Sequence, residues 1–277
     1  MKKTLRASFI YLTMLFTIEG NISSGKSTII QELKHTKTLN GLDVVFVDEP
    51  VQIWEQIVDK DGVNMIEKFY ADPKRYSFTF QMMAFISRYT LLNNAIQQNP
   101  NAIIITERCL LTDYNIFAKM LHEKGDMSDI ELDIYKRWFN YFNDDIVLSG
   151  IIYIYCDPAT SHERCIHRNR KGEVISLDYL ILCHEKHETW LKPTSYAMLI
   201  IENTDCEIED VVNEISDFIS DEAFEHFEYT EISEISRVAK QQSGYIYSIL
   251  IKVKDFVWWQ VCKMDAYILK RVSGYLK

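Results

Sequence analysis

An apolar run near the N-terminus, Met14–Glu19, leads directly into the segment GNISSGKST at residues 20–28. A glycine, four further residues and then Gly-Lys-Ser form a turn that joins a buried strand to a helix and wraps phosphate oxygens in backbone N–H groups. Lys26 adds a positive charge, and the hydroxyl of Ser27 suits Mg²⁺. Motors, switches, transporters and kinases all use such a loop. The residues predicted to bind the nucleotide are Gly20, Asn21, Ile22, Ser23, Ser24, Gly25, Lys26, Ser27 and Thr28.

The rest of the chain alternates short apolar runs with longer segments of helical periodicity, which is typical of a parallel α/β sheet. We predict strands at Met14–Glu19, Val44–Asp48, Ile103–Glu107, Ile151–Cys156 and Met198–Glu202. We predict helices at Lys26–Lys37, Val51–Val58, Arg75–Gln97, Asp113–Glu123, Asp129–Leu148, Ser176–Trp190 and Ile208–Ser220.

Composition excludes several classes of protein. The net charge of −10 argues against a nucleic-acid partner, which needs a basic face. The six cysteines are scattered without a Cys-x-x-Cys pair, which favours reduced thiols and a cytoplasmic location, with a mitochondrial one as the alternative. No apolar run is long enough for a transmembrane segment.

The two ends of the chain differ from the middle. Residues 1–13 have the charge pattern of a signal peptide, but we favour an N-terminal extension because cleavage would remove the strand that the phosphate loop needs. Residues 232–277 carry eight Lys or Arg and three Asp or Glu, a net charge of +5, so the first 231 residues hold −15. This basic tail also shows an apolar stripe at helical spacing, which suits packing on the core or on a second subunit, or contact with a partner or a membrane surface.

Charged residues follow two of the predicted strands. Glu49 lies just beyond the second strand and Glu107 and Arg108 end the third, so all three reach the sheet edge where α/β proteins bind ligands. Glu49 can serve as a general base or be a solvated loop residue. Glu107 and Arg108 can be a metal ligand and a phosphate clamp, or a structural ion pair. A basic segment at 167–173, HRNRKGE, suits a loop that closes over phosphates.

Together these motifs resemble the deoxynucleoside kinase family over most of residues 14–220. The loop resembles GNIxxGKST, Glu49-Pro50-Val51 with Trp54 resembles EPVxxW, and Glu107-Arg108-Cys109 resembles ERS, with cysteine in place of serine. Residues 77–88 match the family's SFTFQ…SR segment, and LDYLILCHEKHETWL at 177–191 resembles its LEYLxxLHxxHExWL. The resemblance implies a P-loop kinase fold with a five-stranded parallel sheet flanked by helices, a homodimer built on helices, and ATP with Mg²⁺ as cofactors.

The resemblance also implies residue roles. Glu49 is the expected base for the 5′-hydroxyl, with Arg108 holding that end of the substrate, while Lys26, Ser27 and Glu107 organise ATP and Mg²⁺. Gln81 is expected to read the base edge, and Tyr70 with Glu173 to bind the 3′-hydroxyl. The expected lid arginines, which stabilise the transferring phosphoryl group, are Arg168 and Arg170, in a lid shorter than that of the animal enzymes. The residues expected to contact the substrate are Glu49, Trp54, Tyr70, Gln81, Arg88, Arg108, Asp113 and Glu173.

The expected substrate follows from one pair of residues. Arg88 and Asp113 resemble the arginine–aspartate pair that lies beside the base in the deoxycytidine and deoxyguanosine kinase branch of the family. Ala84 resembles the residue of the deoxycytidine kinases more than that of the deoxyguanosine kinases. A charged pair fills the space that the methyl group of thymine needs. An ordinary salt bridge between helices is the alternative. We therefore expect deoxycytidine to be favoured, with deoxyadenosine and deoxyguanosine also accepted, in the salvage of DNA precursors.

We predict an N-terminal extension at 1–13, a kinase domain at 14–220 and a helical C-terminal extension at 221–277. Two other functions remain open from the sequence. A thymidylate-like monophosphate kinase would place a second arginine cluster at its acceptor, whereas this chain has Glu49 and Tyr70. An inactive kinase-like assembly subunit would be free to lose Lys26, Glu49 or Arg108, and all three are present.

Overall fold

The computed structural model describes residues 13–170, 173–203 and 206–241, with side chains described up to residue 225. Its sheet has six strands in the order β2-β3-β4-β1-β5-β6. Five of them are parallel: β1 (Met14–Glu19), β3 (Leu42–Val47), β4 (Ile103–Glu107), β5 (Gly150–Tyr155) and β6 (Met198–Glu202). The five predicted parallel strands are confirmed. The sixth, β2 (Thr38–Leu39), pairs antiparallel with β3 and is too short to give a sequence signal.

The strand order places the phosphate loop at the point where the chain changes direction across the sheet. From β1 the chain moves to β3 and β4 on one side, and then to β5 and β6 on the other. Ligands in open α/β sheets bind beyond the carboxyl ends of the strands at such a point. The loop that follows β1 therefore lies between the residues that follow β4 and those that follow β5.

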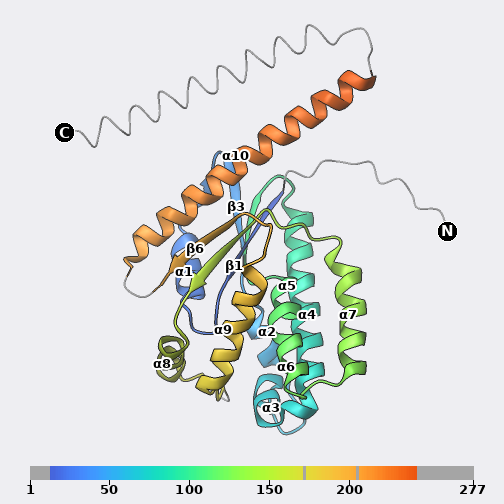
Figure 1. Cartoon of the computed structure of the whole chain (residues 1–277), viewed down its shortest axis with the longest axis vertical. Helices are drawn as coiled ribbons and strands as arrows, with labels where there is room; N and C mark the ends of the chain where they lie inside the picture. Colours follow the sequence, from blue (N-terminus) through green and yellow to red (C-terminus); the bar gives the residue numbers. More distant parts are fainter. Residues whose placement is uncertain (1–12, 171–172, 204–205, 242–277) are drawn as a thin grey trace, which may run out of the picture. The chain divides into compact units, whose positions relative to one another are not determined.

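Helices cover both faces of the sheet (Figure 1). Their bounds are α1 (Lys26–Leu33), α2 (Val51–Gln56), α3 (Met65–Ala71), α4 (Pro73–Gln98), α5 (Leu110–Thr112), the π-helix η1 (Asp113–Ala118), α6 (Lys119–Glu123), α7 (Asp129–Asn143), α8 (Pro158–Arg168), α9 (Leu177–Leu191) and α10 (Ile208–Gln241). Figure 1 shows α4, α5, α6 and α7 together on one side of the sheet.

Successive side chains of β1 point to opposite faces of the sheet and therefore pack in different parts of the core. Leu15 joins the large apolar cluster that includes Phe85 of α4 and Tyr135 of α7. Phe16 points to the opposite face, where its ring meets Phe218 of α10 edge to face at 6.1 Å. Gly150 makes this contact possible, because a Cβ atom there would lie 2.9 Å from the Phe16 ring.

Three helices, α3, α5 and α8, were missed by the sequence prediction, and one was given the wrong form. Helix α3 has only seven residues and is capped by Asn64. Helix α8 includes His167 and Arg168, the first two residues of the basic segment that was interpreted as a loop. Asp113–Glu123 was predicted as a single helix, but it begins as a π-helix, whose wider turns are frequent at functional sites.

Residues 1–224 form one compact unit and residues 225–277 a second. Helix α10 continues to Gln241, beyond the predicted end at Ser220, and its last residues belong to the second unit. Most of the N-terminal extension and the apolar stripe of the basic tail lie outside the described residues. Within the described part of the chain, no helix has both the length and the apolar character that a membrane crossing requires.

Candidate active site

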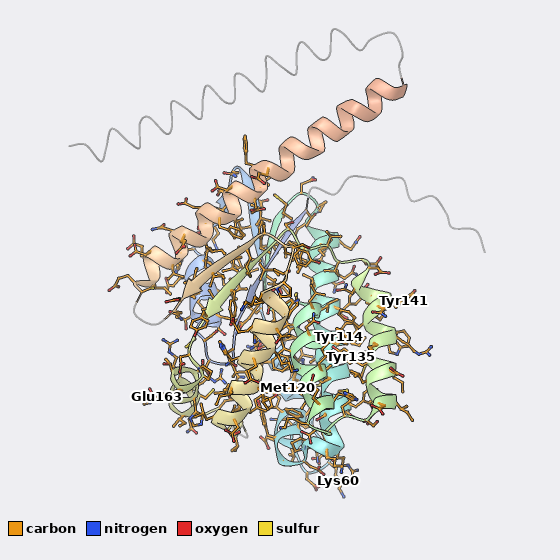
Figure 2. The ribbon with its side chains drawn as sticks, viewed as in Figure 1. Lys60, Tyr114, Met120, Tyr135, Tyr141 and Glu163 are labelled. Carbon is orange, nitrogen blue, oxygen red and sulfur yellow. The ribbon has the colours of Figure 1, made fainter. Side chains whose placement is uncertain are left out.

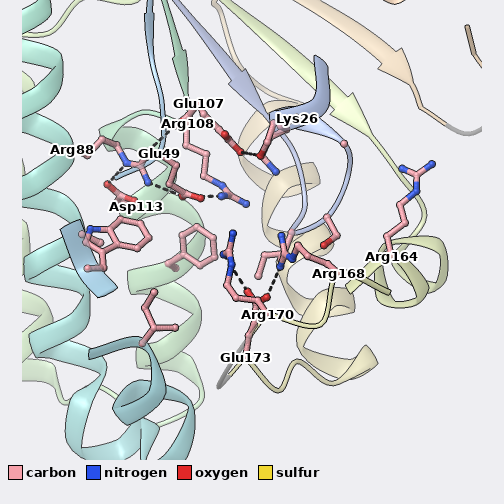
Figure 3. Close-up of a pocket in the computed structure, with 18 of the residues that line it drawn as sticks. Lys26, Glu49, Arg88, Glu107, Arg108, Asp113, Arg164, Arg168, Arg170 and Glu173 are labelled. Atoms are coloured by element: carbon pink, nitrogen blue, oxygen red, sulfur yellow. Dashed lines mark hydrogen bonds and ion pairs between the residues drawn. The ribbon is translucent and has the colours of Figure 1, made fainter. Parts of the chain in front are cut away.

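A cavity of about 570 Å³ lies beyond the carboxyl ends of β1, β3 and β4 (Figure 3). It brings together nearly all of the residues predicted from the sequence to form the site. Those that line it are Ile22, Ser23, Gly25, Lys26, Ser27, Thr28, Glu49, Trp54, Tyr70, Gln81, Arg88, Glu107, Arg108, Asp113, Arg168, Arg170 and Glu173. Gly20, Asn21 and Ser24 do not line the cavity and instead shape the phosphate loop.

Steric limits explain both glycines of the phosphate loop. Gly20 has φ of 145° and Gly25 has φ of 100°, conformations that L side chains rarely adopt. A Cβ atom on Gly20 would lie 2.5 Å from the carbonyl oxygen of Ile154. The loop is also tied to α9, because Asn21 Nδ2 donates to the Leu180 carbonyl at 2.9 Å. Close contacts therefore fix the conformation of the phosphate loop.

Lys26 opens α1 and is buried beneath this loop. Its Nζ donates to the Asn21 carbonyl at 2.7 Å, and its side chain has no carboxylate partner at ion-pair distance among the described residues. Burial, and next the positive charge of Arg108, lower its pKa to about 7. The ammonium group is therefore only partly protonated near neutral pH, and an anion at this point would draw a proton onto it.

Ser27 and Glu107 lie together, although they are far apart in the sequence. Ser27 Oγ donates to Glu107 Oε1 at 2.9 Å. Glu107 ends β4 and is 7% exposed, so its carboxylate sits at the edge of the cavity. A hydroxyl and a carboxylate oxygen are hard ligands of the kind that Mg²⁺ prefers.

The guanidinium group of Arg88, on α4, donates hydrogen bonds to three other parts of the site. Its Nε donates to Asp113 Oδ2 at 2.9 Å, its Nη1 to the Glu107 carbonyl at 2.7 Å, and its Nη2 to Glu49 Oε1 at 3.1 Å. The side chain is 2% exposed. Burial opposes its charge, but Asp113 and then Glu49 raise the pKa of Arg88 above its ordinary value. The guanidinium thus links α4, the π-helix and the ends of β3 and β4.

Arg108 adds a second guanidinium to the same carboxylate. Its Nη1 donates to Glu49 Oε1 at 2.9 Å and its Nη2 to the Gly20 carbonyl at 3.3 Å. The backbone of Arg108 has φ of 62°, a strained conformation for a residue with a side chain, and its N–H donates to the Ile18 carbonyl at 3.1 Å. This turn directs the side chain from the end of β4 back toward the phosphate loop.

The two arginines keep Glu49 ionised. Burial favours the neutral acid, but Arg108, Arg88 and Lys26 together lower the pKa of Glu49 to about 2. The side chain is 17% exposed, so the carboxylate still reaches the cavity. One face of Glu49 is held by guanidinium groups and the other is available to a ligand.

The half of the cavity farther from the phosphate loop is aromatic. Trp54 of α2 packs edge to face on Phe80, and its Nε1 donates to Ser87 Oγ at 2.8 Å. Gln81 of α4 is buried, and its Oε1 has no hydrogen-bond partner among the described residues. Burial, and then the charge of Glu173, raise the pKa of Tyr70 well above its usual range, so its hydroxyl remains a neutral donor.

The last residue of α8, Arg168, contributes to the other wall together with Arg170 and Glu173. Arg168 Nη2 donates to Glu173 Oε2 at 2.5 Å, and Arg170 Nη1 lies 3.8 Å from Glu173 Oε1 (Figure 3). Glu173 is thereby drawn into the cavity together with the two arginines that were assigned to a lid.

Several residues that line the cavity were missed by the sequence analysis. Phe80 precedes Gln81, and Phe117 lies four residues after Asp113 on the π-helix, so both were within reach of the motifs already identified. Arg164 of α8 and Asn203, which follows β6, belong to no motif. Only the fold brings these two residues to the phosphate loop.

The arrangement combines an anion cradle, an ionised carboxylate and an aromatic compartment, which suits transfer of a phosphoryl group to a small aromatic-bearing alcohol. The sequence model of the deoxynucleoside kinases matches residues 16–221. The chain belongs to the deoxynucleoside kinase family. It is thus an enzyme that phosphorylates deoxynucleosides, and membership of a kinase family implies ATP as the phosphate donor. Neither a monophosphate kinase nor an inactive subunit is favoured.

Individual relatives agree with this assignment. The chain is 38% identical to a probable deoxycytidine kinase of fowlpox virus over 211 residues, which are 74% of this chain and 80% of the relative. It is 36% identical to human deoxycytidine kinase over 196 residues, 63% of this chain and 74% of the relative. It is also 32% identical to a mitochondrial deoxyguanosine kinase of Xenopus laevis over 194 residues, 63% of this chain and 72% of the relative.

The lowered pKa of Lys26 predicts proton uptake when the phosphate chain binds. At pH 8 the phosphates of ATP have lost their protons, whereas Lys26, with a pKa of about 7, is largely neutral in the free enzyme. Binding should raise this pKa and take up close to one proton per ATP. Calorimetry in buffers of different ionisation enthalpy measures the uptake. Lys26→Arg, which is always charged, should abolish it; equal uptake by both proteins would contradict this account.

Proposed function

We propose that the protein transfers the γ-phosphate of ATP to the 5′-hydroxyl of a deoxynucleoside, with deoxycytidine as the preferred substrate. The observation that carries the proposal is the placement of Glu49. Its carboxylate is ionised, is held by Arg88 and Arg108, and lines the cavity between the phosphate loop and the aromatic compartment. A hydroxyl group that is positioned there can pass its proton to Glu49 while it attacks the phosphorus atom.

The aromatic compartment supports a nucleoside as the acceptor. The faces of Phe80 and Phe117 suit a flat base, and the unpaired amide oxygen of Gln81 can accept a hydrogen bond from an amino group on the base edge. Tyr70 and Glu173 line the same cavity, where a hydroxyl donor and a carboxylate suit the 3′-hydroxyl of the sugar. Trp54 closes the wall beside them.

The donor half fits ATP with Mg²⁺. Backbone N–H groups of residues 20–28 and the ammonium group of Lys26 would hold the phosphate chain. Ser27 Oγ and Glu107 Oε1, 2.9 Å apart, would hold the metal, since Mg²⁺ needs few protein ligands when phosphates and water complete its shell. The bound ion would neutralise charge on the phosphates. Arg168 and Arg170 would then exchange Glu173 for the transferring phosphoryl group.

The preference for deoxycytidine rests on Arg88 and Asp113. The pair is buried, with both side chains 2% exposed, and it closes the cavity beside Gln81 and Ala84. A buried ion pair cannot shift to admit a methyl group without leaving a charge unpaired, which is strongly destabilising. Cytosine presents an amino group to this wall, whereas thymine presents a methyl and a carbonyl group. The names of two of the relatives, which are deoxycytidine kinases, point the same way.

Removing the charge of Glu49 should abolish turnover. Glu49→Gln keeps the shape of the side chain but removes the proton acceptor, so kcat should fall by about 10²–10⁴, while ATP binding changes little because Glu49 does not line the phosphate loop. Steady-state kinetics and calorimetry measure the two quantities. Glu55→Gln, an exposed change on α2, the helix that follows Glu49, is the matched control. Wild-type turnover in Glu49→Gln would refute the assignment of the base.

The substrate preference can be measured directly. ADP release from ATP and Mg²⁺ is followed with each of the four deoxynucleosides in turn. We expect kcat/KM to be highest for deoxycytidine and lowest for thymidine, by at least about tenfold, because one misplaced methyl group is worth roughly 1–3 kcal/mol. If kcat/KM were highest for thymidine, the protein would still be a deoxynucleoside kinase, but the proposed role of Arg88 and Asp113 in substrate preference would be refuted.

We further propose a homodimer that forms through α7. Large apolar side chains are exposed along one side of this helix at spacings of four, four and three residues: Ile130 (74%), Ile134 (40%), Trp138 (47%) and Tyr141 (70%). Such a stripe on a surface helix is typical of an interface, and Figure 2 shows Tyr141 on the outer part of α7.

A cytoplasmic location is proposed from the free cysteines of the described residues. The basic tail is proposed to contact a partner or a membrane surface.

If α7 forms the interface, charges on its apolar stripe should separate the subunits. Sedimentation of the Ile134→Lys/Trp138→Glu variant at micromolar concentration should show a monomer, and the wild type a dimer. Ile200→Glu, at a half-exposed position on β6, should remain dimeric. The proposal fails if the wild type is monomeric or if the α7 variant still sediments as a dimer.

A further inference from the structure

The carbonyl group of Ser24, in the phosphate loop, is held by two side chains from outside that loop. Asn203 Nδ2 donates to it at 2.7 Å, and Arg164 Nη1 lies at 3.5 Å. Asn203 follows β6 and Arg164 belongs to α8, so both come from distant parts of the sequence. Ser24 is fully buried, and its carbonyl is thus fixed from one direction.

The two side chains also hold each other. Arg164 Nη2 donates to the backbone carbonyl of Asn203 at 3.1 Å, and the N–H of Asn203 donates to the carbonyl of Tyr155 at 2.9 Å. Asn203 is therefore tied to the end of β5 as well as to α8. Arg164 and Asn203, which we call the Ser24 bracket, join the carboxyl ends of β5 and β6 to the phosphate loop.

Gly25 supplies an independent sign that the loop and the bracket fit closely. A Cβ atom on Gly25 would lie 2.2 Å from Asn203 Nδ2, so the amide occupies the space that a side chain would need. The C=O and N–H groups of a trans peptide point in opposite directions. Because the Ser24 carbonyl points toward the bracket, the N–H of Gly25 in the same peptide unit points to the inside of the loop, where a phosphate binds.

We propose that Asn203 and Arg164 are positioning residues for phosphate binding: they orient the Ser24–Gly25 peptide so that its N–H faces the phosphate chain of ATP. This role differs from that of Arg168 and Arg170, whose guanidinium groups pair with Glu173 and lie apart from Arg164 (Figure 3). The inference rests on the proposed phosphate site. It adds that phosphate binding depends on Asn203 and Arg164, which belong to no motif.

The test measures the binding of ATP, inorganic tripolyphosphate and deoxycytidine to the full-length protein by calorimetry. Asn203→Ala removes one hydrogen bond and should weaken ATP and tripolyphosphate by about tenfold each, while deoxycytidine binding is unchanged. The aspartate side chain in Asn203→Asp has nearly the same size but lacks the N–H donor, so this variant should bind ATP and tripolyphosphate at least as weakly as Asn203→Ala does. In kinetics, KM for ATP should rise and KM for deoxycytidine should not.

Two control variants isolate the bracket. Glu202→Gln changes the exposed residue next to Asn203, and Glu163→Gln changes the exposed residue next to Arg164 (Figure 2); both should bind all three ligands as the wild type does. Because Asn203 and Arg164 act on one carbonyl, the loss in an Asn203→Ala/Arg164→Ala double variant should be smaller than the product of the single losses.

Three results would overturn the inference. Weaker ATP binding with unchanged tripolyphosphate binding would mean that Asn203 contacts the base of the nucleotide instead. Unchanged binding of both would mean that the loop holds its shape alone. Loss of all three ligands together with a lower melting temperature would mean a general role in folding. If the wild type bound no tripolyphosphate, the proposed phosphate site itself would be refuted.

Discussion

The site depends on the buried guanidinium group of Arg88. The guanidinium of Arg88 is 2% exposed, and a charge in that position is tolerated only if every partner is in place. Its partners come from three elements: Asp113 from the π-helix, the Glu107 carbonyl from the end of β4, and Glu49 from the loop after β3. Removing any one of them leaves part of the buried guanidinium without a partner. The residues proposed to set specificity, to hold the metal and to act as the base are thus joined through one guanidinium group.

This unit also fixes the charge of Glu49. A carboxylate beside one arginine would be an ordinary ion pair, but Arg88 and Arg108 share one oxygen of Glu49, and Lys26 lies near enough to contribute to its charged state. Because the folded-state pKa of about 2 is below the unfolded value of 4.5, this interaction stabilises the fold above the unfolded pKa and is lost as pH falls toward 2. The contacts that hold the proposed proton acceptor therefore also stabilise the fold.

The sequence predicted the parts of the site that lie in local motifs. The phosphate loop, Glu49 and Arg108 each follow a strand and Glu107 ends one, and the parallel sheet brings strand ends together without further information. The π-helix was not predicted; its first residue, Asp113, pairs with Arg88 of α4, which is distant in the sequence. Arg164 and Asn203 carry no local signal: their roles exist only after β5, β6 and α8 have met the phosphate loop. Helix α3 was missed because it is too short for its periodicity to be distinctive.

The most direct test of this account is the ionisation of Glu49 itself. Glutamate labelled with ¹³C at the carboxyl carbon is followed by NMR from pH 8 to pH 4, and the Glu49 signal is assigned as the one lost in Glu49→Gln. The account predicts that this signal does not shift over the whole range, because Arg88 and Arg108 keep the group ionised. A titration with a midpoint at or above the ordinary pKa of 4.5 would show that the two guanidinium groups do not hold Glu49 as described.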